Sequence, residues 1–358
     1  MLRRRFLSGT LAAGAGIVLA PVSADAASSD YEKAVERTWG PMRAGRERLE
    51  LVRFATLAAN SHNSQPWKFS VAEDRITIHA DFKRRCPAVD PDDHHLFASL
   101  GGAAENMVHA AEAVGLKADP VFTDDSVVIG LSAAPANRSP LFSAITQRQC
   151  TRAGYDGKPV DNEALRLLER ISVEPGVSAM MITDVGQMRA VGDYVEQGNS
   201  AQLRDKAFMT ELVDWLRFSE SDAVATMDGL FSGASGNPVL PSWIARPLMN
   251  FVFTESGENK KYREHIASSS GIVVFSSDAD DRRHWVAAGR ACQRFALQVT
   301  ALGLKYAYIN QPVEVSGLRS QFAAYLGLGT RRPDFVVRFG HGPSLPKSLR
   351  RPPEQLML

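Results

Sequence analysis

The chain has 358 residues, enough to bury two hydrophobic cores or one large one. Its 41 basic and 40 acidic residues nearly balance, so no chain-wide field favours nucleic acid or an anionic membrane as a partner. The three cysteines, Cys86, Cys150 and Cys292, are far apart and predict neither a disulfide framework nor a zinc site.

The N-terminus has the layout of an export signal. Arg3-Arg4-Arg5-Phe6-Leu7 precedes a mildly apolar run over 11–20, and Ala24-Asp25-Ala26 has the small-x-small form of a cleavage site. The pattern resembles a twin-arginine signal peptide over residues 1–26, which implies the twin-arginine export machinery as a partner and a periplasmic protein. An uncleaved anchor is the alternative, although the run is too short and too rich in Gly and Ala for a stable membrane span.

The loop Ala59-Asn60-Ser61-His62-Asn63-Ser64-Gln65-Pro66-Trp67 follows an amphipathic helical run over 49–58. It gathers amide, hydroxyl and imidazole groups beside an aromatic residue that Pro66 anchors. Such a loop suits a planar, hydrogen-bonding heterocycle, and a flavin is such a ligand. The alternative is a turn capped by Asn60 and Ser61, with Trp67 as ordinary core.

An acidic and imidazole cluster comes next, and its members are Asp90, Asp92, Asp93, His94 and His95. These are ligand types that metals use. They also stand where a helix begins before Leu96, and acidic residues there cap free amides and complement the helix dipole. Capping is the favoured interpretation, so we predict no metal ligand.

A weak internal repeat spans the chain. Residues 101–117 align without a gap on residues 289–305, and each segment is an amphipathic helix that ends in Gly-Leu-Lys. A strand pattern precedes each helix, at 75–79 and 271–275, and another follows it, at 127–131 and 335–339. The repeat predicts a pseudo-dimer fused in one chain. The alternative is that any two amphipathic helices with glycine stops align this well.

Two irregular segments divide the chain further. Residues 133–140 are the expected linker between the halves. Residues 222–259 interrupt the second repeat and mix glycines and prolines with large apolar side chains. A closing lid needs this mixture, because it must move and yet bury surface when shut. A fixed packing insert and a membrane-touching patch are the alternatives.

Basic residues of the second half are candidates for binding a phosphate. Arg148 and Arg152, with Thr151 between them, can clamp a phosphate through charge-assisted, fork-shaped hydrogen bonds. Two arginines near a helix end are more often a solvated face, but their place at the start of the second repeat favours the clamp. The tail adds Arg350 and Arg351 after a glycine turn.

These motifs together resemble the FMN-dependent nitroreductase superfamily, and the histidine form of the loop resembles its Acg-type branch. The family loop reads PS-x-x-N-S-Q-P-W, from which this chain departs by Ala59 and Asn60. The resemblance implies an α+β nitroreductase-like fold in two related halves, 27–135 and 136–358, with FMN between them. The residues that would hold FMN are Ser61, His62, Asn63, Gln65, Arg148, Thr151, Arg152, Asn310, Gln311, Arg350 and Arg351.

As an enzyme of this type, the protein would pass hydride from NAD(P)H through FMN to a small flat acceptor, a nitroaromatic or a quinone. The flavin carries the chemistry, so no catalytic residue is predicted. No G-x-G-x-x-G follows a strand, so NAD(P)H would bind transiently. The alternatives are a non-catalytic protein that sequesters FMN under the lid and a flavin-free envelope binding module. The chain would be a monomer whose two halves form a pseudo-dimer, or it would assemble into a higher oligomer.

Overall fold

The computed structural model describes residues 24–358. The predicted export signal lies outside this range except for Ala24-Asp25-Ala26, which begin helix α1 (Ala24–Trp39). Within the described range, no helix combines the length and the apolarity that a bilayer span requires.

The first half is an antiparallel four-stranded sheet with a long helix packed on it. Its strands run in the order β1-β2-β4-β3, and Trp67, Ile76 and Ile129 point into the core against the helix. The elements of this half are α2 (Glu47–Thr56), η1 (Ser61–Asn63), β1 (Trp67–Val71), β2 (Arg75–Ala80), η2 (Phe82–Arg84), α3 (His94–Ala113), β3 (Leu116–Thr123) and β4 (Ser126–Ala133).

The second half repeats this topology. Its sheet has the order β5-β8-β10-β9 and is again antiparallel throughout, so each strand has a counterpart in the first sheet. The elements are α4 (Pro140–Ile145), α5 (Asn162–Ile171), β5 (Val177–Ile182), β8 (Gly271–Ser277), α11 (Arg282–Ala301), β9 (Lys305–Tyr308), α12 (Gln311–Glu314), α13 (Ser316–Tyr325), β10 (Arg332–Gly340) and η4 (Pro353–Leu356). The α+β class predicted from the sequence is confirmed.

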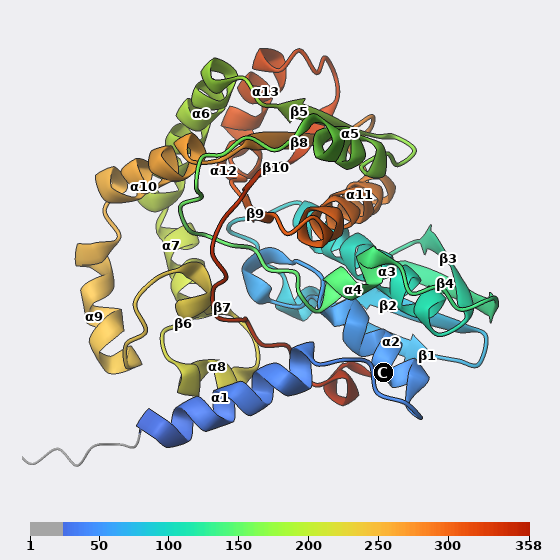
Figure 1. The fold of residues 1–358 in the computed structure, drawn as a ribbon. Coiled ribbons are helices and arrows are strands. Elements are labelled where there is room, and N and C mark those ends of the chain that lie inside the picture. Colours follow the sequence, from blue (N-terminus) through green and yellow to red (C-terminus); the bar gives the residue numbers. More distant parts are fainter. Residues whose placement is uncertain (1–23) are drawn as a thin grey trace, which may run out of the picture.

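The halves meet where α3 and α11 cross at close range, side by side in the middle of the molecule (Figure 1). A Cβ atom on Gly101 would lie 2.0 Å from the carbonyl oxygen of Val286, and one on Gly289 would lie 1.9 Å from that of Ala98. Both distances are far inside van der Waals contact, so neither position has room for a side chain. The repeat pairs Gly101 with Gly289 and Ala98 with Val286, so the crossing itself is symmetric.

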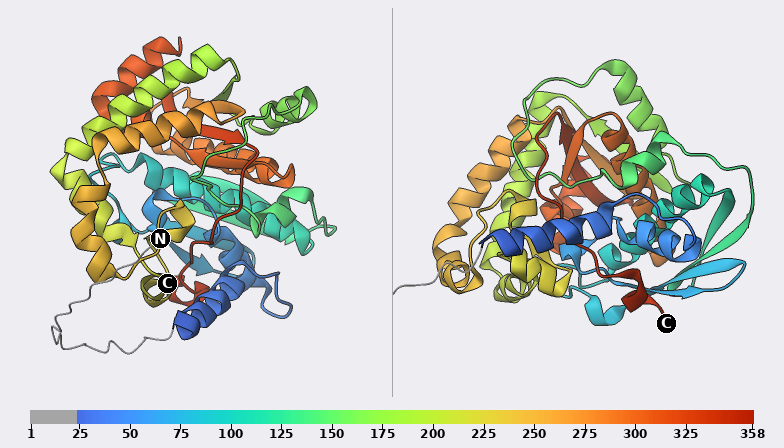
Figure 2. Two further views of the ribbon diagram at one scale, coloured as in Figure 1. Left: turned by 60° about the vertical axis from the view of Figure 1, so that its left-hand side comes forward. Right: turned by 60° about the horizontal axis from the view of Figure 1, so that its bottom comes forward.

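A long insertion separates β5 from β8, whereas a short hairpin joins their counterparts β1 and β2. It is larger than the segment 222–259 that the sequence predicts, because it begins at residue 183. It forms the left side of the molecule in Figure 1 and in the left view of Figure 2. Its elements are α6 (Val185–Arg204), α7 (Lys206–Trp215), β6 (Leu216–Arg217), α8 (Glu220–Thr226), β7 (Leu230–Phe231), η3 (Gly233–Ser235), α9 (Ser242–Val252) and α10 (Glu255–Ala267).

The C-terminal tail returns from the second half to the first. After β10 it crosses the face of the molecule, and Met357 forms a parallel bridge with Phe69 of β1 (Figure 1). The backbone N–H of Leu358 donates to the carbonyl oxygen of Phe69 at 2.9 Å. The tail residues 346–351 are thereby held between α1, the end of α2 and the insertion.

Candidate functional site

Two adjoining cavities lie where the halves, the insertion and the tail meet. The larger, of about 250 Å³, is walled by the loop before β1, by α3 and α11, and by helices of the insertion. The smaller, of about 80 Å³, lies under the tail. They share six lining residues, so they form one continuous site, and these are Ala59, Asn60, Arg152, Leu230, Ser235 and Tyr308.

The smaller cavity is strongly cationic. Arg148, Arg152, Lys347 and Arg350 line it, and none of the described residues lining it is acidic. Burial and the neighbouring arginines lower the pKa of Lys347 to about 7, and they lower that of Arg350 to about 9. Four cations without an acidic partner repel one another, and an anion among them would relieve this repulsion.

Elements of both halves hold these cations in place. The Arg350 guanidinium donates to the carbonyl oxygen of Thr56 at 2.8 Å, and Arg148 donates to that of Leu57 at 2.7 Å. These carbonyls end α2 and have no partner within the helix, so the arginines cap the negative end of its dipole. Lys347 donates in the same way to three carbonyl oxygens of residues 146–148, at 2.8 to 3.2 Å, after α4.

Trp39, at the end of α1, completes the smaller cavity. Its ring centroid lies 4.4 Å from Nζ of Lys347, and the guanidinium carbons of Arg350 and Arg148 lie 5.3 and 5.8 Å from it. The negative face of an indole attracts cations at this range. Sequence reasoning missed both Trp39 and Lys347, although Lys347 stands in the same basic tail motif as Arg350.

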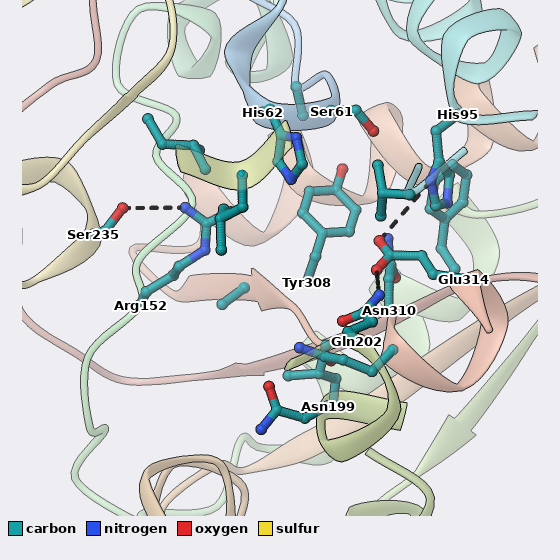
Figure 3. A pocket seen from close by; sticks show the side chains of 18 of the residues that line it. Ser61, His62, His95, Arg152, Asn199, Gln202, Ser235, Tyr308, Asn310 and Glu314 are labelled. Carbon is teal, nitrogen blue, oxygen red and sulfur yellow. Dashed lines mark hydrogen bonds and ion pairs between the residues drawn. The ribbon is translucent and has the colours of Figure 1, made fainter. Parts of the chain in front are cut away.

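Arg152 links the two cavities. Its Nη1 lies 3.5 Å from the Ser235 hydroxyl of the insertion, and it makes no ion pair with any described residue (Figure 3). The side chain stands beside Tyr308, which also borders both cavities. Thr151, predicted with it, is buried but lines neither cavity, and its hydroxyl finds no hydrogen-bond partner among the described residues.

The loop before β1 has an unusual backbone, because His62, Asn63 and Gln65 all have positive φ angles, between 49° and 54°. Asn63 fixes it by donating from Nδ2 to the carbonyl oxygens of Gly229, at 2.9 Å, and Leu349, at 3.1 Å. The first contact holds the insertion and the second holds the tail. The loop is therefore the point at which three distant segments are tied together.

Gln65 and Arg351 differ from the sequence prediction. Gln65 donates to the carbonyl oxygen of Met227 at 2.9 Å and accepts from the backbone N–H of Arg351 at 2.9 Å, and the Arg351 guanidinium donates to the carbonyl oxygen of Gln65 at 2.7 Å. Neither residue lines a cavity. Their hydrogen-bonding groups are used to join the loop to the tail, a role that the sequence motif alone could not separate from ligand contact.

Ser61, His62, Asn310 and Gln311 line the larger cavity, as the prediction requires. Burial lowers the pKa of His62 to about 4, with the positive charge of Arg152 adding to the shift, so its imidazole is neutral at pH 7. Asn310 accepts the backbone N–H of Val336 at 2.9 Å. The Gln311 carbonyl oxygen is buried and has no partner among the described residues, so it can accept a hydrogen bond from a ligand.

His95 and Glu314 line the larger cavity next to each other, and sequence reasoning missed both as site residues (Figure 3). Their closest nitrogen and oxygen atoms are 3.9 Å apart, and Gln202 donates to the carboxylate of Glu314 at 2.6 Å. The capping prediction for this region is confirmed at Asp90, whose two oxygens accept the backbone N–H groups of His95 and Leu96, each at 3.0 Å.

Comparisons with curated proteins extend over both halves, although no family model matches the chain. A Mycobacterium tuberculosis H37Rv protein provisionally named NAD(P)H nitroreductase Rv3131 is 24% identical over 320 residues, which are 85% of this chain and 88% of that protein. A second protein of the same strain, provisionally named NAD(P)H nitroreductase acg, is 21% identical over 326 residues, 85% of this chain and 93% of that protein.

Solved structures of similar shape include a nitroreductase with bound FMN from Desulfitobacterium hafniense DCB-2. It aligns at a TM-score of 0.36 with 13% identity, over 60% of this chain and 93% of that one. The FMN-dependent nitroreductase NfnB from Mycobacterium smegmatis, in complex with NADPH, aligns at a TM-score of 0.39 with 12% identity. This alignment covers 57% of this chain and 87% of that one. The strand order and helix packing described above, and not these overlays, define the fold.

Proposed function

We propose that this chain, a distant member of the nitroreductase superfamily, binds one FMN in the two cavities and acts as an NAD(P)H oxidoreductase on a small flat acceptor. The observation that carries the proposal is the cluster of four cations around the smaller cavity, which lacks an acidic lining residue among those described and opens into a larger cavity. Such a pair of spaces suits a ligand with an anionic end and a planar end.

The residues present fit this cofactor. Arg148, Lys347 and Arg350 would hold the phosphate, and Arg152 would contact it from the side of the ring. Gln311 offers a free acceptor in the larger cavity, and the free Oδ1 of Asn63 in the smaller cavity could accept from a hydroxyl group of the ligand, not from its phosphate. Bound FMN would supply the redox chemistry, while the protein holds it and limits the access of water. This set differs from the predicted one by adding Lys347, by omitting Thr151, and by leaving Gln65 and Arg351 as positioning residues.

The second candidate, a protein that sequesters FMN without turnover, is favoured by the insertion. Gly229, Leu230 and Ser235 line the smaller cavity, and the last two also line the larger. Asn63 ties this wall to the loop through the carbonyl of Gly229. A wall fastened in this way limits access to a ring inside. Slow reduction of bound flavin by NAD(P)H would identify the sequestering protein, and rapid multiple turnover would identify the enzyme.

Export to the periplasm by the twin-arginine machinery belongs to the same proposal, and it is based on the N-terminal residues alone. A periplasmic location would favour the sequestering protein, because free NAD(P)H is scarce there. Cell fractionation of the full chain beside an Arg3→Lys, Arg4→Lys variant tests the route. Export that is unaffected by the double substitution would contradict it.

The test of FMN binding uses Arg152→Ala. The purified protein is expected to be yellow and to release FMN, not FAD, on denaturation. Loss of one charge-assisted partner of a partly buried phosphate costs roughly 1.5 to 3 kcal/mol, so FMN affinity should fall about ten- to a hundredfold. The fold should be unaffected, because Arg152 has no ion pair to lose among the described residues.

Arg166→Ala is the matched control, since Arg166 is exposed on α5, away from both cavities. It should leave FMN affinity unchanged. A colourless protein that takes up no added FMN would contradict both candidate functions. Unchanged FMN affinity in Arg152→Ala, together with a lower melting temperature of the flavin-free protein, would assign Arg152 a structural role instead.

A further inference from the structure

Three side chains of metal-ligating type converge beside the larger cavity, apart from the cation cluster. They are His62 of the loop before β1, Cys86 of the segment after η2, and Glu211 of α7. One ligand atom of each lies within 4.8 Å of the other two. Two of the segments belong to the first half and the third belongs to the insertion, so only the folded chain brings these residues together.

The chemistry of this set matches zinc. Imidazole nitrogen, thiolate sulfur and carboxylate oxygen are the three ligand types of protein zinc sites, and three protein ligands leave a fourth position for water. His62 makes no hydrogen bond with a described residue, and its Nδ1 is buried. Its imidazole is neutral, as a metal ligand must be, because burial lowers its pKa to about 4.

Glu211 is oriented for the same role. Its two oxygens accept the backbone N–H groups of Ala88, at 2.9 Å, and Val89, at 3.2 Å. Each oxygen keeps a second lone pair, and such backbone contacts are the kind that orient metal-ligating carboxylates. Burial first, and then the nearby charge of Glu211, raise the pKa of Cys86 to about 12, so the thiol is protonated until a cation displaces its proton.

In a second cluster, formed by Asp90, His94 and His95, the possible ligand atoms also lie within 4.8 Å of one another, but two of these side chains already have hydrogen-bond partners. Asp90 caps α3 with both oxygens, and Nε2 of His94 lies 2.8 Å from a carboxylate oxygen of Asp334. Asp90, His94 and Asp334 thus form buried helix-cap and core hydrogen bonds, whereas both ring nitrogens of His95 lack a hydrogen-bond partner among the described residues. His95 therefore serves as a control that distinguishes the two clusters.

We propose that His62, Cys86 and Glu211 bind one Zn²⁺, and that the metal cross-links the loop before β1 to α7. On binding, the Cys86 thiol loses its proton to solvent and the thiolate bonds to the metal, with no change of oxidation state. Phe208 and Leu212 of α7 line the larger cavity, so the cross-link fixes one of its walls. Cysteine spacing predicts no such site, because the ligands are distant in sequence.

The experiment loads the full-length purified protein with Zn²⁺, removes free metal by gel filtration, and measures bound zinc by mass spectrometry. One zinc per chain is expected for the wild type, together with a higher melting temperature. Cys86→Ser and Glu211→Gln should each weaken zinc binding by at least about tenfold. Cobalt substitution should give a thiolate charge-transfer band that Cys86→Ser abolishes.

Asp214→Asn is the matched control for Glu211→Gln, since Asp214 is exposed on the same helix. It should bind zinc as the wild type does, and so should His95→Gln. Absence of zinc from the wild type, equal zinc in all variants, or its loss in His95→Gln would overturn the site. Zinc content is measured on flavin-free protein, so the zinc result is obtained independently of FMN binding, and neither Cys86 nor Glu211 lines either cavity.

Discussion

At the residue scale, Lys347 is the most unusual cation of the site. Burial lowers its pKa to about 7, with Arg148, Lys305 and Arg350 adding to the shift, whereas a free lysine titrates above pH 10. Between these two values the unfolded chain binds more protons at Lys347 than the folded chain. This group therefore makes the flavin-free protein more stable as pH rises from about 7 to about 10.

A bound phosphate reverses this preference, because a dianion beside Lys347 favours the ammonium form. FMN binding should then take up a proton above pH 7, and FMN affinity should fall as pH rises from about 7 to about 9. In Lys347→Arg the side chain stays charged, so this part of the pH dependence should disappear. Titrations of flavin-free protein with FMN at a series of pH values measure the slope. Identical slopes for wild type and variant would contradict a phosphate contact by Lys347.

Part of this site could be predicted from the sequence, and individual residues show why. Arg148, Arg152 and Arg350 were predicted because their spacing and motif are legible in the chain, and all three line the smaller cavity. Trp39 was missed because an aromatic residue at the end of an amphipathic helix has the pattern of ordinary core. Gln65 was assigned to the ligand because a motif names a residue but not the direction in which its amide points.

At the element scale, the repeat could be detected in the sequence because the ends of its helices are marked by glycine residues. Gly115 and Gly303 follow α3 and α11 with φ angles of 80° and 73°, which suit glycine. The full extent of the insertion was not legible. Its helices α6 and α10 bury apolar residues against the second sheet and have the patterns of any core helix. Only the pairing of β5 with β8 shows that residues 183–270 interrupt the sheet.

The tie between the loop and the insertion can be tested without removing either element. Deletion of 229–243 would remove β7 and Ser235, which form part of the cavity walls. Asn63→Ala removes two hydrogen bonds, each worth about 1 kcal/mol, and leaves the wall intact. If this wall limits access, NADH should reduce bound flavin about tenfold faster in the variant.

Stopped-flow measurement of flavin absorbance follows this reduction directly. Asn162→Ala, an exposed substitution at the start of α5, serves as the control and should reduce at the wild-type rate. An unchanged rate in Asn63→Ala would show that the wall does not gate the ring. Weaker FMN binding with an unchanged rate of reduction would instead assign Asn63 a role in holding FMN.

At the scale of the whole molecule, two related halves would offer two equivalent sites, but the contacts between α3 and α11 are not equivalent. On the side of the cavities, Gly102 and Gln293 line the larger one. In the repeat, Arg290 is the equivalent of Gly102, and Glu105 is the equivalent of Gln293. At that second position Glu105 pairs with Arg290 at 3.1 Å and with Arg294 at 2.6 Å, and Glu174 pairs with both arginines. Charged side chains fill the position that corresponds, by the repeat, to this part of the larger cavity.

The protein should therefore bind one FMN per chain, and the ion network should act in stability alone. Burial would raise the pKa of Glu105, but the His109 imidazole at 3.3 Å, the hydrogen bonds from Arg294 and the charges of Arg294 and Arg290 hold it at about 2. Because this folded-state pKa lies below the unfolded value, its contribution is complete above about pH 4.5 and is lost as pH falls toward 2.

Glu105→Gln leaves two arginines without this partner, so we expect a loss of roughly 3 kcal/mol in the free energy of unfolding at pH 7. The loss should shrink at pH 3, where wild-type Glu105 contributes less. Urea unfolding at both pH values measures it, with the exposed Glu163→Gln as control. FMN titration of the same proteins should end at one equivalent per chain in every case. Binding of a second equivalent of FMN would contradict the interpretation that ion pairs fill the second site. An equal loss of stability at both pH values would contradict it as well.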